Sequence, residues 1–353
     1  MKITFILPCY PNKPIGGLRI VYEYANELVA RGHEVTAIHP AYLVHSAYGN
    51  NMKAGSTLPP PPPVHWQKID ARVKMEYVPY LGEENIPDAD SIIATAWYTA
   101  DYVNQYSPAK GAKFYLIQSY EIWDGPEKLV NQTWHYPMNK IVVSRWLHKI
   151  GEKMGATDLK YIPNAIDHEK FRITTPIGKR PNKIAMLFSN NEIKGAMDGL
   201  KAILLAKKEI PELEVVCFGV PKRNRAIPKG IQYIRNPTQK QLVEEIYNGS
   251  SMYLCPSWIE GWGLPSSEAM ACGCALISTK NGGVEDFAKH NHTALLSPIK
   301  NPKKLAEHII RLAKDDVYRM QIAKNGIETI KQFNYKRSTD LLEEYLVTKS
   351  IRF

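Results

Sequence analysis

Several patterns that would assign a function at once are missing from the sequence. No run approaches the roughly 18 uninterrupted apolar residues that a membrane-spanning helix needs. The five cysteines form no C-x-x-C pair and the ten histidines show no H-E-x-x-H or zinc-ligand spacing, so we expect reduced thiols and no metal site. The loop at residues 8–17 lacks the G-x-G-x-x-G of a nicotinamide dehydrogenase. These absences argue against a membrane-spanning protein, a zinc hydrolase and a dehydrogenase.

Basic residues outnumber acidic residues in the chain. Lys and Arg number 45 against 35 Asp and Glu, which gives a net charge of +10. Such a surplus suits a partner that carries phosphates, either a nucleotide or an anionic membrane surface, and it also serves plain solubility. No basic patch with interleaved aromatic residues is present, so we expect no nucleic-acid partner. The first residues are typical of a strand rather than of a signal peptide, which predicts a cytoplasmic protein. The basic surplus would favour peripheral contact with the inner face of the membrane.

Strand and helix patterns alternate along the 353 residues, a length that favours two hydrophobic cores. Residues 3–7 form a continuous apolar run, typical of a parallel strand covered on both faces, and helical spacing and a second strand at 34–39 follow. Two helices are expected to close the chain, one through Leu305 and Leu312 and one through Leu341 and Tyr345. Further strands are expected at 91–96, 114–118, 141–144, 184–188, 213–218, 252–255 and 275–278. The pattern breaks around Pro163 and restarts near Lys183, so the sequence predicts two doubly wound, Rossmann-like α/β domains.

Residues 256–273 are the most informative stretch. They run from a buried strand through a glycine-rich loop into a helix that begins near Pro265. In an open α/β sheet this is where ligands bind, and a helix N-terminus offers free N–H groups and positive potential to a phosphate. Gly261 and Gly263 allow a ligand to approach the backbone closely.

Two carboxylates of this stretch, Glu260 and Glu268, are candidates for hydroxyl recognition. Both can point into one cleft, where a carboxylate accepts paired hydrogen bonds from the vicinal hydroxyls of a sugar or ribose. The competing interpretation is structural: Glu268 stabilises the dipole of its own helix and Glu260 is a solvated loop charge. The glycine-rich turn between them favours the functional interpretation.

The stretch resembles a known family. Glu260 and Glu268 lie in P-S-x-x-E-G-x-G-L-P-x-x-E-A-M-A-x-G, which is similar to the E-x7-E signature of glycosyltransferase family 4. The resemblance implies the GT-B fold, in which two Rossmann-like domains face a central cleft. Residues 1–165 would then form an acceptor-side domain and residues 166–335 a nucleotide-sugar-binding domain. Residues 336–353 would form a helix that packs back on the N-terminal domain.

The resemblance also implies roles for individual residues. Glu260 and Lys194 would be catalytic, with Glu260 on the hydroxyls of the donor sugar and Lys194 on its diphosphate. Glu268 would bind the ribose, and Gly282-Gly283 matches a turn that follows the next strand. The donor-binding residues implied are Gly16, Gly17, Ser189, Lys194, Gly261, Trp262, Gly263, Leu264 and Glu268.

The sequence departs from the family pattern at two positions. Ser189 stands where members often carry an arginine that binds phosphate. On the acceptor side Gln118, Tyr120 and Glu121 stand where a histidine is common, similar to a Gln-x-Tyr-Glu variant of polysaccharide-related members. Together with the proline-bearing segment 43–68, these residues are expected to face the acceptor.

The activity implied is retaining transfer of a hexose-type sugar from a nucleotide-diphosphate sugar to a glycan or lipid-linked acceptor, in cell-surface polysaccharide or glycoconjugate synthesis. No cofactor is expected, and no metal, because no D-x-D stands where a nucleotide diphosphate would need magnesium. The leaving phosphate would help to deprotonate the acceptor, whereas a covalent role for Glu260 is the older alternative. A nucleotide-sugar epimerase or phosphorylase of the same fold, or an inactive nucleotide-sugar-binding scaffold, stays open.

Overall fold

A computed structural model describes residues 1–10, 14–43 and 64–350 of the chain. The chain divides into two compact units, Met1–Ala165 with Tyr335–Phe353, and Ile166–Asn334. Most of the segment 43–68, including the proline run at 59–63, lies outside the described residues.

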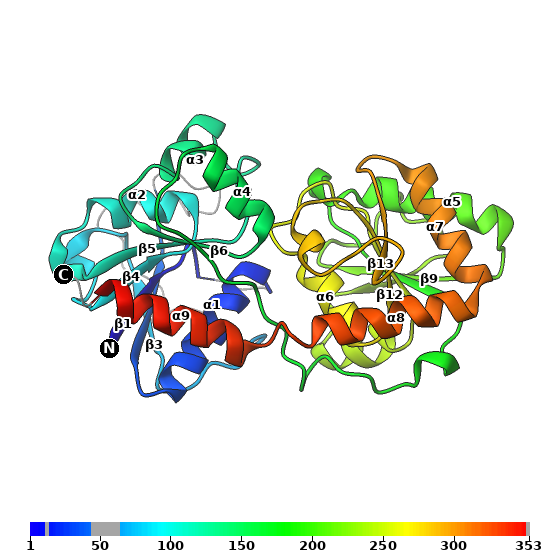
Figure 1. The fold of residues 1–353 in the computed structure, drawn as a ribbon, viewed down its shortest axis with the longest axis horizontal. Helices are drawn as coiled ribbons and strands as arrows, with labels where there is room; N and C mark the ends of the chain where they lie inside the picture. The colour runs from blue at the N-terminus through cyan, green and yellow to red at the C-terminus, as the bar shows by residue number, and fades with distance from the viewer. Residues whose placement is uncertain (11–13, 44–63, 351–353) are drawn as a thin grey trace. The chain divides into compact units, whose positions relative to one another are not determined.

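The first unit is built on a parallel sheet, whose strand order is β3-β2-β1-β4-β5-β6-β7 among the described residues. Its strands are β1 (Lys2–Ile6), β2 (Glu34–Pro40), β3 (Lys74–Val78), β4 (Ser91–Ala94), β5 (Ala112–Ile117), β6 (Asn139–Val142) and β7 (Leu159–Tyr161). Its helices are α1 (Gly16–Ala30), α2 (Trp97–Gln105), α3 (Glu127–Thr133), α4 (Arg145–Lys153) and α9 (Tyr335–Ser350). The last helix returns to this unit and packs on α1 (Figure 1), where Arg31 pairs with Asp340 at 2.8 Å and Glu343 at 2.6 Å.

The second unit holds a parallel sheet of order β10-β9-β8-β11-β12-β13 in the part of the chain that is described. Its strands are β8 (Lys183–Leu187), β9 (Glu214–Gly219), β10 (Gln232–Arg235), β11 (Met252–Cys255), β12 (Ala275–Thr279) and β13 (Ala294–Ser297). Its helices are α5 (Ala196–Glu209), α6 (Leu264–Ala271), α7 (Pro302–Lys314), α8 (Asp316–Ile330) and a π-helix, Gln241–Tyr247. β11 and β12 are buried along their whole length, as apolar parallel strands between helices should be.

In each sheet the first strand of the unit lies in the interior, and the chain winds to one side before it returns to the other. The reversal falls between β1 and β4 in the first unit and between β8 and β11 in the second. This is the doubly wound topology predicted from the sequence, so the fold class is confirmed. It also marks the two positions where the carboxyl ends of strands diverge and leave room for a ligand.

The expected strands are present with small shifts of their bounds, but the edge strands β3, β7, β10 and β13 were not predicted. Three of these are partly exposed, so they lack the continuous apolar run of an interior strand. The two closing helices that were expected are present as α7 and α9, but a helix that was not predicted, α8, lies between them. Helix α8 has a weak apolar pattern, because Arg319, Ala323 and Gly326 share its buried face with Ile322 and Ile330.

Candidate functional site

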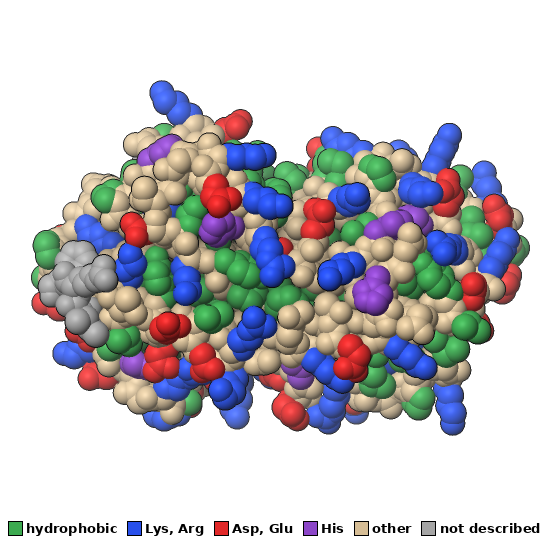
Figure 2. Space-filling model, viewed as in Figure 1, with side chains coloured by type: hydrophobic (Ala, Val, Ile, Leu, Met, Phe, Trp, Pro, Cys, Tyr) green, Lys and Arg blue, Asp and Glu red, His purple; other side chains and the backbone are tan. Residues whose placement is uncertain are grey.

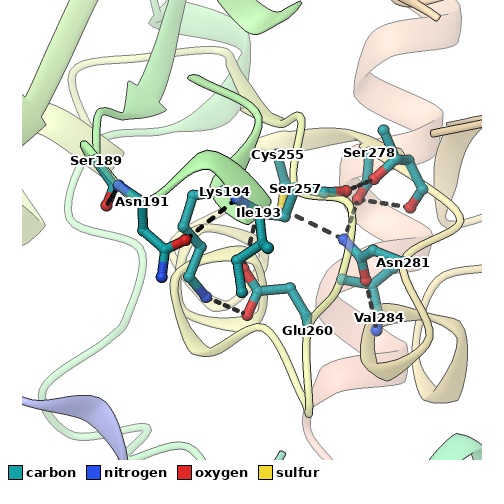
Figure 3. Close-up of polar contacts among 11 residues, drawn as sticks. Ser189, Asn191, Ile193, Lys194, Cys255, Ser257, Glu260, Ser278, Asn281 and Val284 are labelled. Atoms are coloured by element: carbon teal, nitrogen blue, oxygen red, sulfur yellow. Dashed lines mark hydrogen bonds and ion pairs between the residues drawn. The ribbon is translucent and has the colours of Figure 1, made fainter. Parts of the chain in front are cut away.

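The candidate site lies at the switch point of the second sheet. Lys194 follows β8 and Glu260 follows β11, the two strands between which the winding reverses. Together with the start of α6 they line one small pocket, and Figure 3 shows Lys194 and Glu260 pointing toward each other. The lining residues are Leu187, Lys194, Tyr253, Leu254, Cys255, Pro256, Ser257, Glu260, Pro265 and Ser266.

A tight turn places Lys194. The side chain of Asn191 accepts a hydrogen bond from Ile193 N at 3.2 Å, and Lys194 N donates to Asn191 O at 3.0 Å. Gly195, which follows, has φ +60°, and a Cβ built on it would lie 2.1 Å from Pro256 O. Only glycine fits there, because the left-handed conformation and the close approach to the β11 loop both exclude a side chain. The K-G step is thus a packing requirement of the switch point.

The backbone of Glu260 is fixed by the loop after β12. Glu260 N donates to Asn281 O at 2.9 Å, and Gly283 N donates to Glu260 O at 2.9 Å. Gly283 lies so close to this loop that a Cβ would come within 2.5 Å of the Trp262 backbone. The Gly282-Gly283 turn therefore acts as a support for Glu260.

The Glu260 carboxylate has a donor on each oxygen. Lys194 Nζ donates to Oε2 at 2.9 Å and Ser257 Oγ donates to Oε1 at 2.8 Å. The side chain of Glu260 is 12% exposed and that of Lys194 is 31% exposed. Burial lowers the pKa of Lys194, but attraction to Glu260 and their hydrogen bond outweigh it, so the pKa is raised and the lysine stays charged.

Helix α6 faces this pair with its N-terminus, but the amides of its first turn are not free as the sequence predicted. Pro265 has no N–H, and Ser266 N and Ser267 N both donate to Gly263 O, at 3.0 and 3.2 Å. The expected free N–H groups at 265–267 are therefore absent. What α6 offers instead is the positive end of its dipole and the hydroxyl of Ser266, which lines the pocket while its buried Oγ has no partner among the described residues.

The sequence of this unit decides its family. Residues 167–329 match the model of the family described as glycosyl transferases group 1. The second unit belongs to this family. The resemblance to glycosyltransferase family 4 drawn from the E-x7-E block is thereby borne out.

Individual proteins match the chain over different lengths. An uncharacterised glycosyltransferase of Methanocaldococcus jannaschii is 32% identical over 25% of this chain and 25% of its own length. The N-acetyl-alpha-D-glucosaminyl L-malate synthase of Bacillus anthracis is 22% identical over 98% of this chain and 96% of its own. Among solved structures, HepE of Anabaena in complex with UDP and glucose has a TM-score of 0.74 at 15% identity, covering 99% of this chain and 100% of that one. The last likeness concerns the fold, which is GT-B.

Glu268, the second glutamate of the glycosyltransferase signature, does not line the pocket with Glu260. It is 3% exposed, and its Oε2 accepts a hydrogen bond from the hydroxyl of Tyr247 at 3.1 Å. Tyr247 ends the π-helix, a rare form that is often found at functional sites. The two glutamates therefore do not share one set of contacts, as the spacing alone suggested.

The other donor-side candidates of the family lie in different surroundings. Trp262 is buried, with its ring 5.1 Å from that of Phe287 and 5.0 Å from that of Phe333, so its side chain belongs to the core. Ser189 accepts a hydrogen bond from Asn191 N at 3.1 Å and is not among the pocket-lining residues. Gly261 is buried and Leu264 half-buried at the start of α6.

In the first unit, the structure brings together Gly17 and Gln118. Gln118 Nε2 donates to Gly17 O at 3.1 Å, while Gln118 Oε1 is buried without a partner among the described residues. Helix α1 begins at Gly16 without a side-chain cap. An acceptor atom held in this way next to an uncapped helix start is suited to a ligand hydroxyl.

Tyr120 and Glu121 make local contacts in the first unit. Tyr120 donates to Asn131 Oδ1 at 2.8 Å. Glu121 accepts from Trp97 N, the first amide of α2, at 2.8 Å. Burial raises the pKa of Glu121 to about 8. Both side chains thus have structural partners of their own.

Several functional candidates were missed from the sequence, namely Ser257, Ser266, Tyr247 and Asn281. Ser257 and Ser266 stand inside the quoted motif, so their position next to Glu260 and the helix start was a usable signal. Asn281 directly precedes the Gly282-Gly283 turn matched above, which was a usable signal, whereas nothing in the local sequence of Tyr247 points to the site.

The acidic side chains that lie near one another outside the site have protein partners of their own. Asp88 and Asp90 form a D-x-D before β4, but Asp88 pairs with Lys110 at 2.9 Å and Asp90 accepts from Lys2 N at 2.7 Å. No three His, Cys, Asp or Glu side chains of the described residues lie together as a metal site requires. Likewise, no helix in the described ranges is long and apolar enough to cross a membrane.

Proposed function

We propose that the chain is a retaining, metal-independent glycosyltransferase that moves a sugar from a nucleotide-diphosphate sugar to a glycan or lipid-linked acceptor in polysaccharide or glycoconjugate synthesis. The observation that carries the proposal is the Lys194–Glu260 pair at the switch point, beside the start of α6. A cation for phosphate and a carboxylate for hydroxyls, 2.9 Å apart, match the two ends of the bond that such an enzyme breaks.

In the proposed mechanism Lys194 stabilises the charge that develops on the leaving group. Departure of the nucleoside diphosphate leaves an oxocarbenium-like sugar and growing negative charge on phosphate oxygens. The ammonium of Lys194, the positive end of α6 and the hydroxyl of Ser266, which has no partner in the described part of the chain, would meet that charge without a metal. The phosphate oxygen released on the same face of the sugar would accept the acceptor's proton, which retains the anomeric configuration.

Glu260 is assigned to the hydroxyls of the donor sugar. Its carboxylate is engaged by Lys194 and Ser257, which supports an orienting role rather than nucleophilic attack. Glu268 is assigned to the nucleotide ribose, with Tyr247 as a fixed donor on one of its oxygens. Ser189 leaves one phosphate contact to be supplied by another group.

The first unit is assigned to the acceptor. Gln118 Oε1, with no partner among the described residues, is the group we expect to bind an acceptor hydroxyl, next to the start of α1. Figure 2 shows Lys and Arg side chains spread over the visible face with Asp and Glu between them. Peripheral membrane contact would therefore depend on the summed charge of +10. Binding of the protein to anionic vesicles should weaken as the salt concentration rises.

The test is a thermal-shift screen of nucleotide sugars followed by a transfer assay with the strongest binder. A ligand that binds the folded state raises the melting temperature with its concentration. UDP sugars come first, since HepE was solved with UDP and glucose. We expect transfer with retention that persists in excess chelator. Rescue of a chelated enzyme by magnesium or manganese would refute metal independence, and donor consumption without any acceptor would favour an epimerase or phosphorylase.

A further inference from the structure

A chain of hydrogen bonds leads through the pocket wall into the Glu260 carboxylate, and its members are drawn in Figure 3. Asn281 Nδ2 lies 3.6 Å from Cys255 Sγ, Cys255 Sγ lies 3.6 Å from Ser257 Oγ, and Ser257 Oγ lies 2.8 Å from Glu260 Oε1. Cys255, Ser257 and Asn281 are all buried. The chain joins the loop after β11 to the loop after β12.

The direction of every bond in this chain is determined by chemistry. Val284 N can only donate, and its contact with Asn281 Oδ1 at 3.4 Å turns the amide nitrogen of Asn281 toward Cys255. At the other end an ionised carboxylate only accepts, so Ser257 gives its single hydroxyl hydrogen to Glu260. The thiol hydrogen of Cys255 then points to the Ser257 oxygen. Ser257 has no other hydrogen to offer, so its orientation is fixed.

Ser257 is fixed through its backbone as well. The hydroxyl of Thr279 donates to Ser257 O, and Asn281 O accepts from Glu260 N at 2.9 Å. The donor and the acceptor of the Ser257–Glu260 bond are thus attached to the end of β12 and to the loop that follows it. A bond between two anchored groups holds one carboxylate rotamer, whereas the flexible four-carbon stem of Lys194 lets its ammonium move.

We infer that Ser257 is a positioning residue that holds the Glu260 carboxylate in place when Lys194 leaves it for the donor phosphate. The inference rests on the proposed function. A diphosphate in the pocket would compete with Glu260 for the Lys194 ammonium, because both side chains line that pocket. Ser257 keeps its hydrogen bond to Oε1, so Oε2 is released at a fixed position where a sugar hydroxyl can donate to it.

The test is Ser257→Ala, with Ser251→Ala as the matched control. Ser251 is also buried, but it lies at the amino end of β11, where its hydroxyl bonds Lys183. Loss of a hydrogen bond to a charged group should lower kcat on the nucleotide sugar by about ten- to a hundredfold. Affinity for the free nucleoside diphosphate should stay within about twofold, because that ligand has no sugar for Glu260 to orient. The control should keep kcat.

A cycle with Glu260→Ala separates positioning from general damage. Adding Ser257→Ala to Glu260→Ala should cost nothing further, because the only group that Ser257 positions is gone. Full additivity, or an unchanged kcat in Ser257→Ala alone, would overturn the inference. Ser257→Cys keeps one hydrogen to donate and should retain more activity than the alanine variant. It provides a second test if Ser257→Ala does not fold stably.

Calorimetry with UDP and UDP-glucose separates this inference from the proposed function. If the wild-type chain binds both ligands without transferring sugar, the proposed function fails, yet the role of Ser257 is still tested by binding. Ser257→Ala should then weaken UDP-glucose and leave UDP unchanged. Equal affinities of wild type and variant for UDP-glucose overturn the positioning role, and binding of neither ligand by the wild type, nor of any nucleotide sugar in the screen, overturns both.

Discussion

Removal of the Lys194 charge should disturb the free protein as well as ligand binding, because the ammonium is paired with Glu260 before any donor arrives. Lys194→Met keeps the aliphatic stem and removes the charge. Glu260, 12% exposed, would keep Ser257 as a donor and lose its counter-charge. The free energy of unfolding should therefore fall, and Glu260→Gln in the same chain should recover part of it.

The burial of the pair sets the size of the effect. Exposed ion pairs contribute about 0–1 kcal/mol, and breaking a fully buried pair costs about 3–5 kcal/mol. With side chains 31% and 12% exposed, the Lys194–Glu260 pair lies between, and we expect about 1–2 kcal/mol. At about 2–4 °C per kcal/mol for a unit of this size, Lys194→Met should lower Tm by about 2–8 °C.

Calorimetric melting of wild type, both single variants and the double variant is the assay. The double variant should melt above Lys194→Met, since it no longer holds an unpaired carboxylate. Because the pKa of Lys194 is raised, the contribution of its charge is fully present below about pH 10.4 and is lost as pH rises through the higher folded-state pKa, so the Tm differences should be constant from pH 7 to 9. UDP affinity should fall about ten- to a hundredfold in Lys194→Met. A double variant less stable than Lys194→Met, or unchanged UDP affinity, would refute the reasoning.

Further predictions concern Tyr247, Gly195 and Glu121. Tyr247→Phe removes the donor on Glu268 and should weaken UDP binding several-fold with little change in kcat, as titration calorimetry and kinetics would show. Gly195→Ala should lower the free energy of unfolding by at least about 2 kcal/mol. The loss should exceed that of Gly32→Ala, because Gly32 also has a positive φ but has open space around it. Equal losses of stability in denaturant unfolding would contradict the packing argument. Burial raises the Glu121 pKa from 4.5 to about 8, so ionisation costs stability. Glu121→Gln should therefore gain Tm over the wild type as pH rises from 4.5 to 8, and a flat difference would contradict it.

The sequence predicted those parts of the site that depend on local order along the chain. A buried strand followed by a glycine-rich turn and a helix start is visible in the motif, and so is the K-G step that precedes α5. Lys194 and Glu260 follow neighbouring parallel strands, and topology alone brings such positions to one sheet edge. Their pairing was therefore within reach of sequence reasoning.

The sequence did not predict the direction in which each side chain of the site points. Glu268 and Trp262 lie in the same motif as Glu260, yet one bonds Tyr247 and the other packs on Phe287. Those partners arrive from elements distant in sequence, and their register decides which way each side chain turns. The prediction of free amides at the start of α6 was wrong for a local reason, because the amides of the first turn donate to Gly263 O.

The return of α9 to the first unit means that the second unit is an insertion within the first. Residues 166–334 are one uninterrupted segment, whereas the first unit is assembled from both ends of the chain. Tyr345 at the far end still bonds Asp158 O at 3.0 Å. In topological terms the segment with Lys194 and Glu260 is a cassette inserted into a host domain. Recombination between relatives could exchange that cassette whole and leave the host's core, including α1 against α9, untouched.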